Sequence, residues 1–169
     1  GGVRNISVNN CQFLGTDVGL RFKSKRGRGG VVENIWIRNI SMIDIPTEPV
    51  TFNLYYGGKS AVEVLESGEV VPVKVAPMPV DETTPCFRNI HIEHLTCSNA
   101  RRAMYFNGIP EMPIDGITLK HIRISAKNDA EFYYCKNKIH IRISAKNDAE
   151  FYYCKNIYKE DVKIELLVK

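Results

Sequence analysis

Asn34-Ile35-Trp36-Ile37 is one copy of a motif that recurs along the chain, an asparagine followed by apolar residues at alternate positions. The other copies are Asn5-Ile6-Ser7-Val8, Asn89-Ile90-His91-Ile92, Gly116-Ile117-Thr118-Leu119 and Asn156-Ile157. The first two copies in the chain lie 29 residues apart, and Asn89 and Gly116 lie 27 apart. A fixed period of this length in strand-like segments is typical of a solenoid, in which every repeat adds one strand to each sheet. The spacing therefore predicts an all-β chain that folds as a right-handed parallel β-helix.

The alternation also predicts which side chains line the interior, because successive residues of a strand face opposite sides. The expected interior positions are Ile6, Val8, Cys11 and Phe13 in the first coil, then Ile35, Ile37, Ile40 and Met42, then Ile90, Ile92 and Leu95. The recurrent asparagine fits a turn, since its side chain bonds nearby backbone and tolerates the left-handed region. Trp36 should face outward, where packing under a loop is favoured over a role as a sugar platform.

One gap in the repeat is too long for a single coil. Asn34 and Asn89 lie 55 residues apart, and removing residues 57–84 leaves 27, the usual period. The removed segment carries three prolines and five acidic residues. Long loops in compact folds are often lids or binding loops, so we interpret 57–84 as a loop insertion that forms a cleft wall. An insertion without function is the alternative.

A second irregularity lies near the C-terminus, where the sequence HIRISAKNDAEFYYCKN at 121–137 recurs identically at 140–156. Other coils have diverged far beyond such identity, so we interpret 138–156 as a recent or engineered duplication. We expect the added unit to form an extra coil with each residue on its counterpart, for example Ile143 on Ile124. Cys154 would then lie within disulfide reach of Cys135, although free thiols are expected. The chain from 1 to 169 is thus expected to be a single β-helix domain.

Composition bounds the possible partners. The 169 residues carry a net charge of +4 and are 44% hydrophobic, which suits one domain with a real core. No apolar run is long enough to span a membrane, so we expect no membrane partner. The five cysteines have no metal-type CxxC spacing and are expected to be small buried thiols. We expect no metal and no cofactor.

Positive charge is concentrated in one segment. Residues 18–32 contain no Asp or Glu but hold Arg21, Lys23, Lys25, Arg26 and Arg28, and such a local field attracts a polyanion. The Arg-Gly tract at 25–30 is short and lies between two expected strands, whereas RNA-binding tracts of this type are long and disordered. We therefore expect no nucleic-acid partner.

The centre of this segment, Leu20-Arg21-Phe22-Lys23, alternates like a strand. If the apolar pair is buried, Arg21 and Lys23 stand together on an exposed face. Such a pair suits a carboxylate, which a guanidinium grips with two hydrogen bonds and an ammonium attracts as a point charge. A solvated strand edge carries the same charges, so this pattern alone leaves both interpretations open.

The sequence around the pair resembles that of glycoside hydrolase family 28, the polygalacturonase-type pectinases. Gly19-Leu20-Arg21-Phe22-Lys23-Ser24 is similar to the family's Arg-Ile-Lys motif, with Phe22 in place of Ile. The similarity extends over most of the chain, through GGVRNI (1–6), GRGG (27–30), PVTFNLYY (49–56) and GIPEMPI (108–114). It implies a parallel β-helix and a pectin-type anionic polysaccharide as partner. It also implies that the chain is the C-terminal portion of a longer, secreted or periplasmic enzyme.

The resemblance assigns substrate-binding residues but no catalytic ones. It implies that Arg21 and Lys23 bind the carboxylate of a galacturonate unit, and that a tyrosine one coil later joins them. Tyr56 aligns best and Tyr55 second, whereas strand parity turns Tyr55 outward, so both are kept. The family's Asn-Thr-Asp, Asp-Asp and Gly-His-Gly segments are absent from the sequence, and Asp17 is expected to be structural.

Two functions follow from this mixture of features. The first is the C-terminal part of a pectin-degrading glycoside hydrolase that cleaves α-linked galacturonate with inversion of configuration. The present chain alone is then expected to be inactive. Inverting hydrolysis needs a carboxylic acid and a carboxylate base, and the resemblance places neither here. The second is a non-catalytic β-helix, either a scaffold or a polyanion-binding module. The histidines, His91, His94, His121 and His140, are expected to be surface or packed side chains in both cases.

Overall fold

The computed structural model describes residues 1–55, 62–64, 70–72, 74–136, 143–144 and 150–155. Every regular element in these ranges is a strand, and none is a helix long and apolar enough to cross a membrane. The strands are β1 (Gly2–Leu14), β2 (Leu20–Lys23), β3 (Val31–Ile45), β4 (Val50–Asn53), β5 (Val62–Val64), β6 (Val70–Pro72), β7 (Cys86–Asn107), β8 (Ile114–Tyr133), β9 (Cys135–Lys136), β10 (Ile143–Ser144) and β11 (Glu150–Tyr152).

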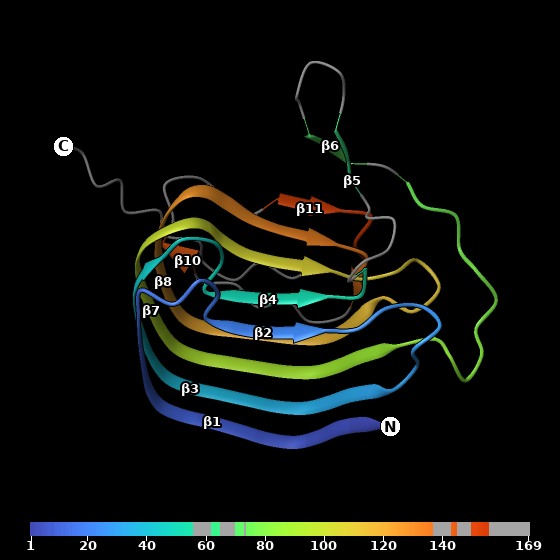
Figure 1. Ribbon diagram of the computed structural model, residues 1–169, viewed down its shortest axis with the longest axis horizontal. Coiled ribbons are helices and arrows are strands. Elements are labelled where there is room, and N and C mark those ends of the chain that lie inside the picture. The colour runs from blue at the N-terminus through green and yellow to red at the C-terminus, as the bar shows by residue number, and fades with distance from the viewer. Residues whose placement is uncertain (56–61, 65–69, 73, 137–142, 145–149, 156–169) are drawn as a thin grey trace.

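The chain forms the predicted right-handed parallel β-helix. The long strands β1, β3, β7 and β8 lie side by side and bend together around one edge of the molecule (Figure 1). After the bend, the last residues of β7 pair with β4, which in turn pairs with β2. All of these pairings are parallel. Each coil therefore contributes a strand to more than one wall of the helix.

Residues with positive φ bend the coils at five-residue intervals. In β3 they are Asn34, Asn39 and Asp44, and the matching residues of β7 are Asn89, His94 and Asn99. Non-glycine residues rarely adopt this conformation, and Asn and Asp do so most readily. The prediction that the recurrent asparagine occupies a left-handed turn is therefore confirmed for Asn5, Asn34 and Asn89, with Gly116 at the same phase.

The corner asparagines are joined from coil to coil by their side-chain amides. The Nδ2 group of Asn34 donates to Oδ1 of Asn5 at 3.0 Å, and Nδ2 of Asn89 donates to Oδ1 of Asn34 at 2.5 Å. One corner further along, Asn39 donates to Asn10 at 3.1 Å. These ladders satisfy polar side chains at the turns and hold neighbouring coils in register.

The interior follows the predicted parity. The expected apolar residues of β3 and β7 are almost fully buried, and they pair in register as Ile35 with Ile90 and Ile37 with Ile92. The first coil differs, since Ile6 remains 37% exposed while Ile35 is fully buried. β1 pairs only with β3 among the described strands, so its inner row is covered from one side.

A column of phenylalanine rings starts at β2 and runs through the interior of the β-helix. The rings of Phe22, Phe52, Phe106 and Phe132 stack in that order, with centroid separations of 4.4, 5.0 and 4.9 Å. The column follows from register, because each of these residues is the strand partner of the next. Stacked rings on parallel strands bury large apolar surfaces and hold the four coils together.

Within residues 57–84, the predicted insertion, β5 pairs with β6 in the antiparallel direction. Residues 74–84 then run along the side of the helix to the start of β7 (Figure 1). The Thr83 carbonyl accepts hydrogen bonds from the amides of Gly27 and Gly29, and the Val75 amide donates to the Tyr134 hydroxyl at 2.7 Å. The segment is thus fastened to the loop that follows Lys23, while its role as a cleft wall stays a prediction.

The described parts of the second repeat copy pair with the first. β11 pairs with β8 so that Phe151 lies opposite Phe132, as predicted. In β10, Ile143 lies opposite Ile122 and not opposite Ile124, so that expected pairing is wrong by two residues. An even shift keeps every side chain on its own face of the sheet. Residues 137–142 and 145–149 lie outside the described residues, so a complete extra coil stays a prediction.

The phenylalanine column predicts a graded loss of stability. Phe106 lies inside the column and is fully buried, whereas Phe22 ends it and is half-buried. Phe106→Ala should lower the free energy of unfolding by about 3–5 kcal/mol, because it leaves a cavity between two rings. Phe22→Ala should cost clearly less. Urea unfolding followed by circular dichroism checks the ranking, and equal losses for both variants would contradict it.

Candidate functional site

The cationic strand, Arg21 and Lys23 on β2, has the two-faced character predicted from its sequence. Leu20 and Phe22 point into the core and both cationic side chains are exposed. β2 lies parallel to β4, with Arg21 opposite Thr51 and Lys23 opposite Asn53. The two cations therefore share one face with neutral polar neighbours on the next coil.

Charges elsewhere on the helix are arranged differently. One outer row runs across five strands as Arg4, Glu33, Arg88, Asp115 and Lys136, alternating in sign at every step. Glu33 pairs with Arg4 at 2.8 Å and with Arg88 at 2.6 Å. Like charges directly opposite on neighbouring strands are destabilising, which accounts for the alternation. The cationic strand departs from this pattern because its row neighbours carry no charge.

The rows that begin at Arg21 and Lys23 continue across later coils as a hydrogen-bonded polar network. Thr51 lies opposite Tyr105, and Asn53 lies opposite Asn107. The Asn107 amide donates to the Tyr105 hydroxyl at 2.9 Å, and the Tyr133 hydroxyl donates to Glu131 at 3.0 Å. Burial raises the pKa of Tyr133 above its usual range, and the nearby Glu131 charge raises it further. This phenol therefore stays protonated and acts as a hydrogen-bond donor.

Arg102 ties this network together. Its guanidinium donates to Glu48 and to Glu131 and lies 4.0 Å from the centre of the Tyr105 ring. Burial lowers the pKa of Arg102, but the hydrogen bond to Glu48 and the charge of Glu131 outweigh it, so that the pKa lies above its usual range. Sequence reasoning missed these groups. The only signal in the sequence was that two polar residues, Tyr105 and Asn107, flank the inward-facing Phe106 and so share the opposite face of the strand.

The loop after Lys23 carries an ion pair of its own, between Arg26 and Glu111. Arg26 donates to both carboxylate oxygens of Glu111, at 2.6 and 2.7 Å. The Glu111 side chain is only 3% exposed. Burial raises the pKa of Glu111, but the hydrogen bond from Arg26 and further backbone donors outweigh it, so that the pKa lies below its usual range. This carboxylate is therefore held as a charged partner of Arg26.

Of the two tyrosine candidates, Tyr55 lies beneath Arg26. Its ring centre is 5.6 Å from the guanidinium, and the residue is 6% exposed. Its buried hydroxyl has no hydrogen-bond partner among the residues that the structure describes. Burial raises the pKa of Tyr55 above its usual range, so the hydroxyl keeps its proton as a donor. Tyr56 lies outside the described residues. The substrate role of both tyrosines stays a prediction.

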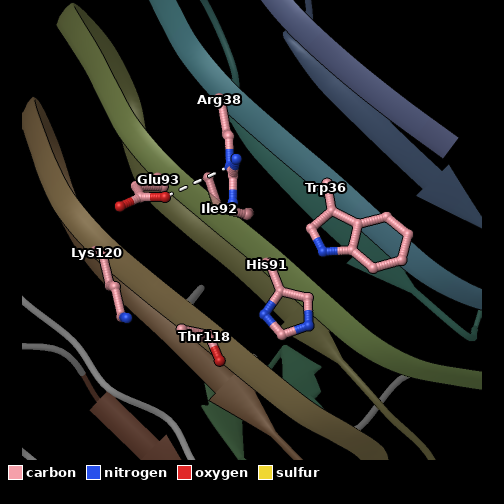
Figure 2. A pocket seen from close by; sticks show the side chains of 7 residues that line it. All are labelled: Trp36, Arg38, His91, Ile92, Glu93, Thr118 and Lys120. Atoms are coloured by element: carbon pink, nitrogen blue, oxygen red, sulfur yellow. Dashed lines mark ion pairs between the residues drawn. The ribbon is translucent and has the colours of Figure 1, made fainter.

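A pocket of about 100 Å³ lies on a different wall, outside β3, β7 and β8 (Figure 2). Trp36 faces outward as predicted and stacks on His91, with ring centres 5.9 Å apart. In the described part of the chain Trp36 therefore borders an open pocket instead of packing under a loop. The pocket is lined by Trp36, Arg38, His91, Ile92, Glu93, Thr118 and Lys120. It does not adjoin the cationic strand, because the bends of the coils separate the two walls.

Three carboxylates of the described coils serve as structural partners of arginines. Glu111 is held by Arg26, and both Glu48 and Glu131 are held by Arg102. Asp17 offers its backbone carbonyl to the Thr47 amide at 3.2 Å, which fits the structural role expected for this turn. An acid that must give up a proton is poorly served by a permanent arginine partner, because the partner stabilises the charged form.

Comparison with known proteins places these features in context. Residues 1–145 match the family described as glycosyl hydrolases family 28. A polygalacturonase from Prunus persica is 26% identical over 137 residues, which cover 80% of the present chain and 31% of the peach protein. No solved structure matches the chain. The present chain thus spans about a third of the length of this relative.

The Arg26–Glu111 pair predicts a stability loss that depends on pH. Glu111→Gln should lower the free energy of unfolding at pH 7 by about 1.5–3 kcal/mol, the usual worth of a hydrogen bond to a charged group. The control is Glu93→Gln, since Glu93 forms a more exposed pair with Arg38 at 3.4 Å. Exposed pairs contribute about 0–1 kcal/mol, so the control should change stability less.

The sign of the pH dependence follows from the lowered pKa of Glu111. Its charged form is favoured by folding, so the stabilisation is complete above the ordinary glutamate pKa of about 4.3. The stabilisation disappears as the pH falls through the lower pKa of the folded state. Urea unfolding of the wild type and Glu111→Gln should therefore differ at pH 7 and converge below about pH 4. A difference that does not change with pH would contradict this account.

Proposed function

Because the chain belongs to glycosyl hydrolase family 28, we propose that it binds galacturonan, with Arg21 and Lys23 holding the carboxylate of one galacturonate unit. The observation that carries the proposal is the charge pattern of the outer rows. Cations on the row of Arg4 alternate with carboxylates, whereas Arg21 and Lys23 have Thr51 and Asn53 as row neighbours. The exposed guanidinium of Arg21 lies beside a neutral row neighbour, so its charge can meet the carboxylate of a ligand.

The chemistry of this surface suits a carboxylate-bearing sugar. Two residues on the same face of a strand stand about 6.4–6.8 Å apart along it, so Arg21 and Lys23 can approach one group from two sides. A guanidinium binds a carboxylate with two parallel hydrogen bonds, and the ammonium adds an orientation-tolerant charge. The half-buried side chain of Asn53 adds an amide group that suits the hydroxyls of a sugar ring.

We place hydrolysis outside the chemistry of this chain alone. Inverting hydrolysis requires a carboxylic acid and a carboxylate base about 6.5–9.5 Å apart. The carboxylates Glu48, Glu111 and Glu131 each bind an arginine, which supports a structural use for them. The peach polygalacturonase is far longer than the present chain, so we infer that a complete pectinase draws its acid and base from other coils. Pectin is an extracellular polymer, and we propose an extracellular setting.

A non-catalytic polyanion-binding module is the second candidate. It is favoured by the same arginine-held carboxylates, since these three acids already serve in structural ion pairs. The two candidates predict the same binding behaviour for this chain. They differ in whether the complete protein cleaves galacturonan.

The purified 169-residue chain should release no reducing ends from polygalacturonate. The expected result follows from the proposal that the acid and the base of hydrolysis lie in other coils. The measurement is a reducing-sugar assay with a heat-inactivated sample as control. Release of reducing ends above that control would show that a catalytic pair resides in this chain.

The cationic strand should control affinity for galacturonan. Arg21→Ala and Lys23→Ala should each weaken binding of an oligogalacturonate by about 1.5–3 kcal/mol, because a charged hydrogen-bond partner is removed. Calorimetric titration provides the measurement. Arg123→Ala is the matched control, since Arg123 is an exposed strand cation on β8.

Three comparisons make this test decisive. Both variants should unfold at the same urea concentration as the wild type, because both side chains are exposed. A methyl-esterified oligogalacturonate should bind weakly to every variant, since it lacks the charge. Equal affinity of the wild type, the two variants and the Arg123→Ala control would refute the assignment.

A further inference from the structure

Two histidines and a glutamate meet on the outer surface between β7 and β8. Glu93 and His94 are consecutive residues of β7, and His121 lies directly across from His94 on β8. One ligand atom of each residue lies within 4.8 Å of the others. The imidazole rings of His94 and His121 stack with centres 4.6 Å apart and planes 6° from parallel. Three metal-ligating side chains therefore converge at one point.

The two histidines occupy a corner that is asparagine in the earlier coils. Asn10 and Asn39 hold this phase in β1 and β3, joined by their amides. His94 and His121 continue the row with the same left-handed backbone, both at φ 53°. The amide ladder ends where the histidines begin. The change from an amide to an imidazole replaces a coil-to-coil hydrogen bond with two nitrogen ligands.

The chemistry of the cluster selects a class of ion. Two neutral imidazole nitrogens and one carboxylate form a donor set that suits Zn²⁺ and related transition metals better than Ca²⁺ or Mg²⁺. Two Zn–N bonds of about 2.0–2.1 Å span at most about 4.2 Å, so both nitrogens must come within that distance of each other to bind one ion. The rings are exposed, so they can turn about their side-chain bonds to do so. Water completes the coordination.

Neighbouring charges shape the site without closing it. Arg38 Nε lies 3.4 Å from Oε2 of Glu93, so this carboxylate already has a charged partner. Partners outside the ligand set can orient ligating carboxylates in metal sites. Lys120 lies opposite Glu93 in the strand register and adds a repulsive charge. The combination points to modest affinity.

We propose that Glu93, His94 and His121 form a surface site for a divalent transition metal, with Zn²⁺ as the reference ion. The ligands come from two successive coils, so a bound ion clips β7 to β8. An ion that binds only the folded chain stabilises it by mass action. The site is separate from the cationic strand and does not depend on the proposed galacturonan binding.

The test uses the untagged full chain, titrated with Zn²⁺ by calorimetry and heated with and without the ion. The variants are His94→Asn and His121→Asn, which keep a residue that tolerates positive φ and restore the residue of the earlier coils. His91→Asn is the matched control, because His91 lies on the same strand but outside the cluster. Unchanged circular dichroism spectra verify that the variants fold.

The expected result is one Zn²⁺ per chain and a higher midpoint of thermal unfolding. His94→Asn and His121→Asn should each weaken binding by at least about tenfold and abolish the thermal shift, while His91→Asn behaves as the wild type. Absorption of the Co²⁺ complex should lack thiolate charge-transfer bands, which excludes the five free cysteines as ligands. Absence of binding, equal binding by all three variants or a thiolate spectrum would overturn the proposal.

Discussion

Coils of this protein can stack only if they turn at the same phase, and residues with positive φ set that phase. Asn34 and Asn89 bend their strands at equivalent points and bond to each other through their side chains. The bend is unfavourable for most residues and mild for asparagine, and the amide ladder adds a hydrogen bond between coils. Once the corners coincide, parallel pairing aligns every residue of one coil with its counterpart in the next.

Alignment turns each position of a coil into a row across the molecule. An inward row becomes a column of core side chains, such as the stack of Phe22, Phe52 and Phe106. An outward row becomes a line of surface groups from distant parts of the sequence. The row of Thr51, Tyr105 and Glu131 arises in this way, from three successive coils. Functional surfaces in this fold are therefore properties of rows and not of contiguous motifs.

This geometry explains how much the sequence could predict. Parity and period identified the interior residues of β3 and β7, the left-handed asparagines and the outward direction of Arg21 and Lys23. They did not identify the Arg26–Glu111 pair, which joins two loops 85 residues apart. Loops have no period from which their partners can be inferred. The two-residue register difference at Ile143 also escaped prediction, because an even shift leaves the inside and outside of the strand unchanged.

The cationic strand and the histidine cluster are both places where a residue differs from the usual pattern of its row. Outer charged rows alternate in sign, as from Arg4 to Glu33 to Arg88, because neighbouring strands bring successive side chains close together. Arg21 stands outside that rule, since its neighbour Thr51 is neutral. Most corner positions are asparagine, and His94 departs from that pattern without changing the backbone. A repeating fold fixes what each row needs for stability. A side chain can fit the local backbone and still differ from the usual residues of its row. Its polar group is then not needed for coil-to-coil pairing of the usual kind and can serve to bind a ligand.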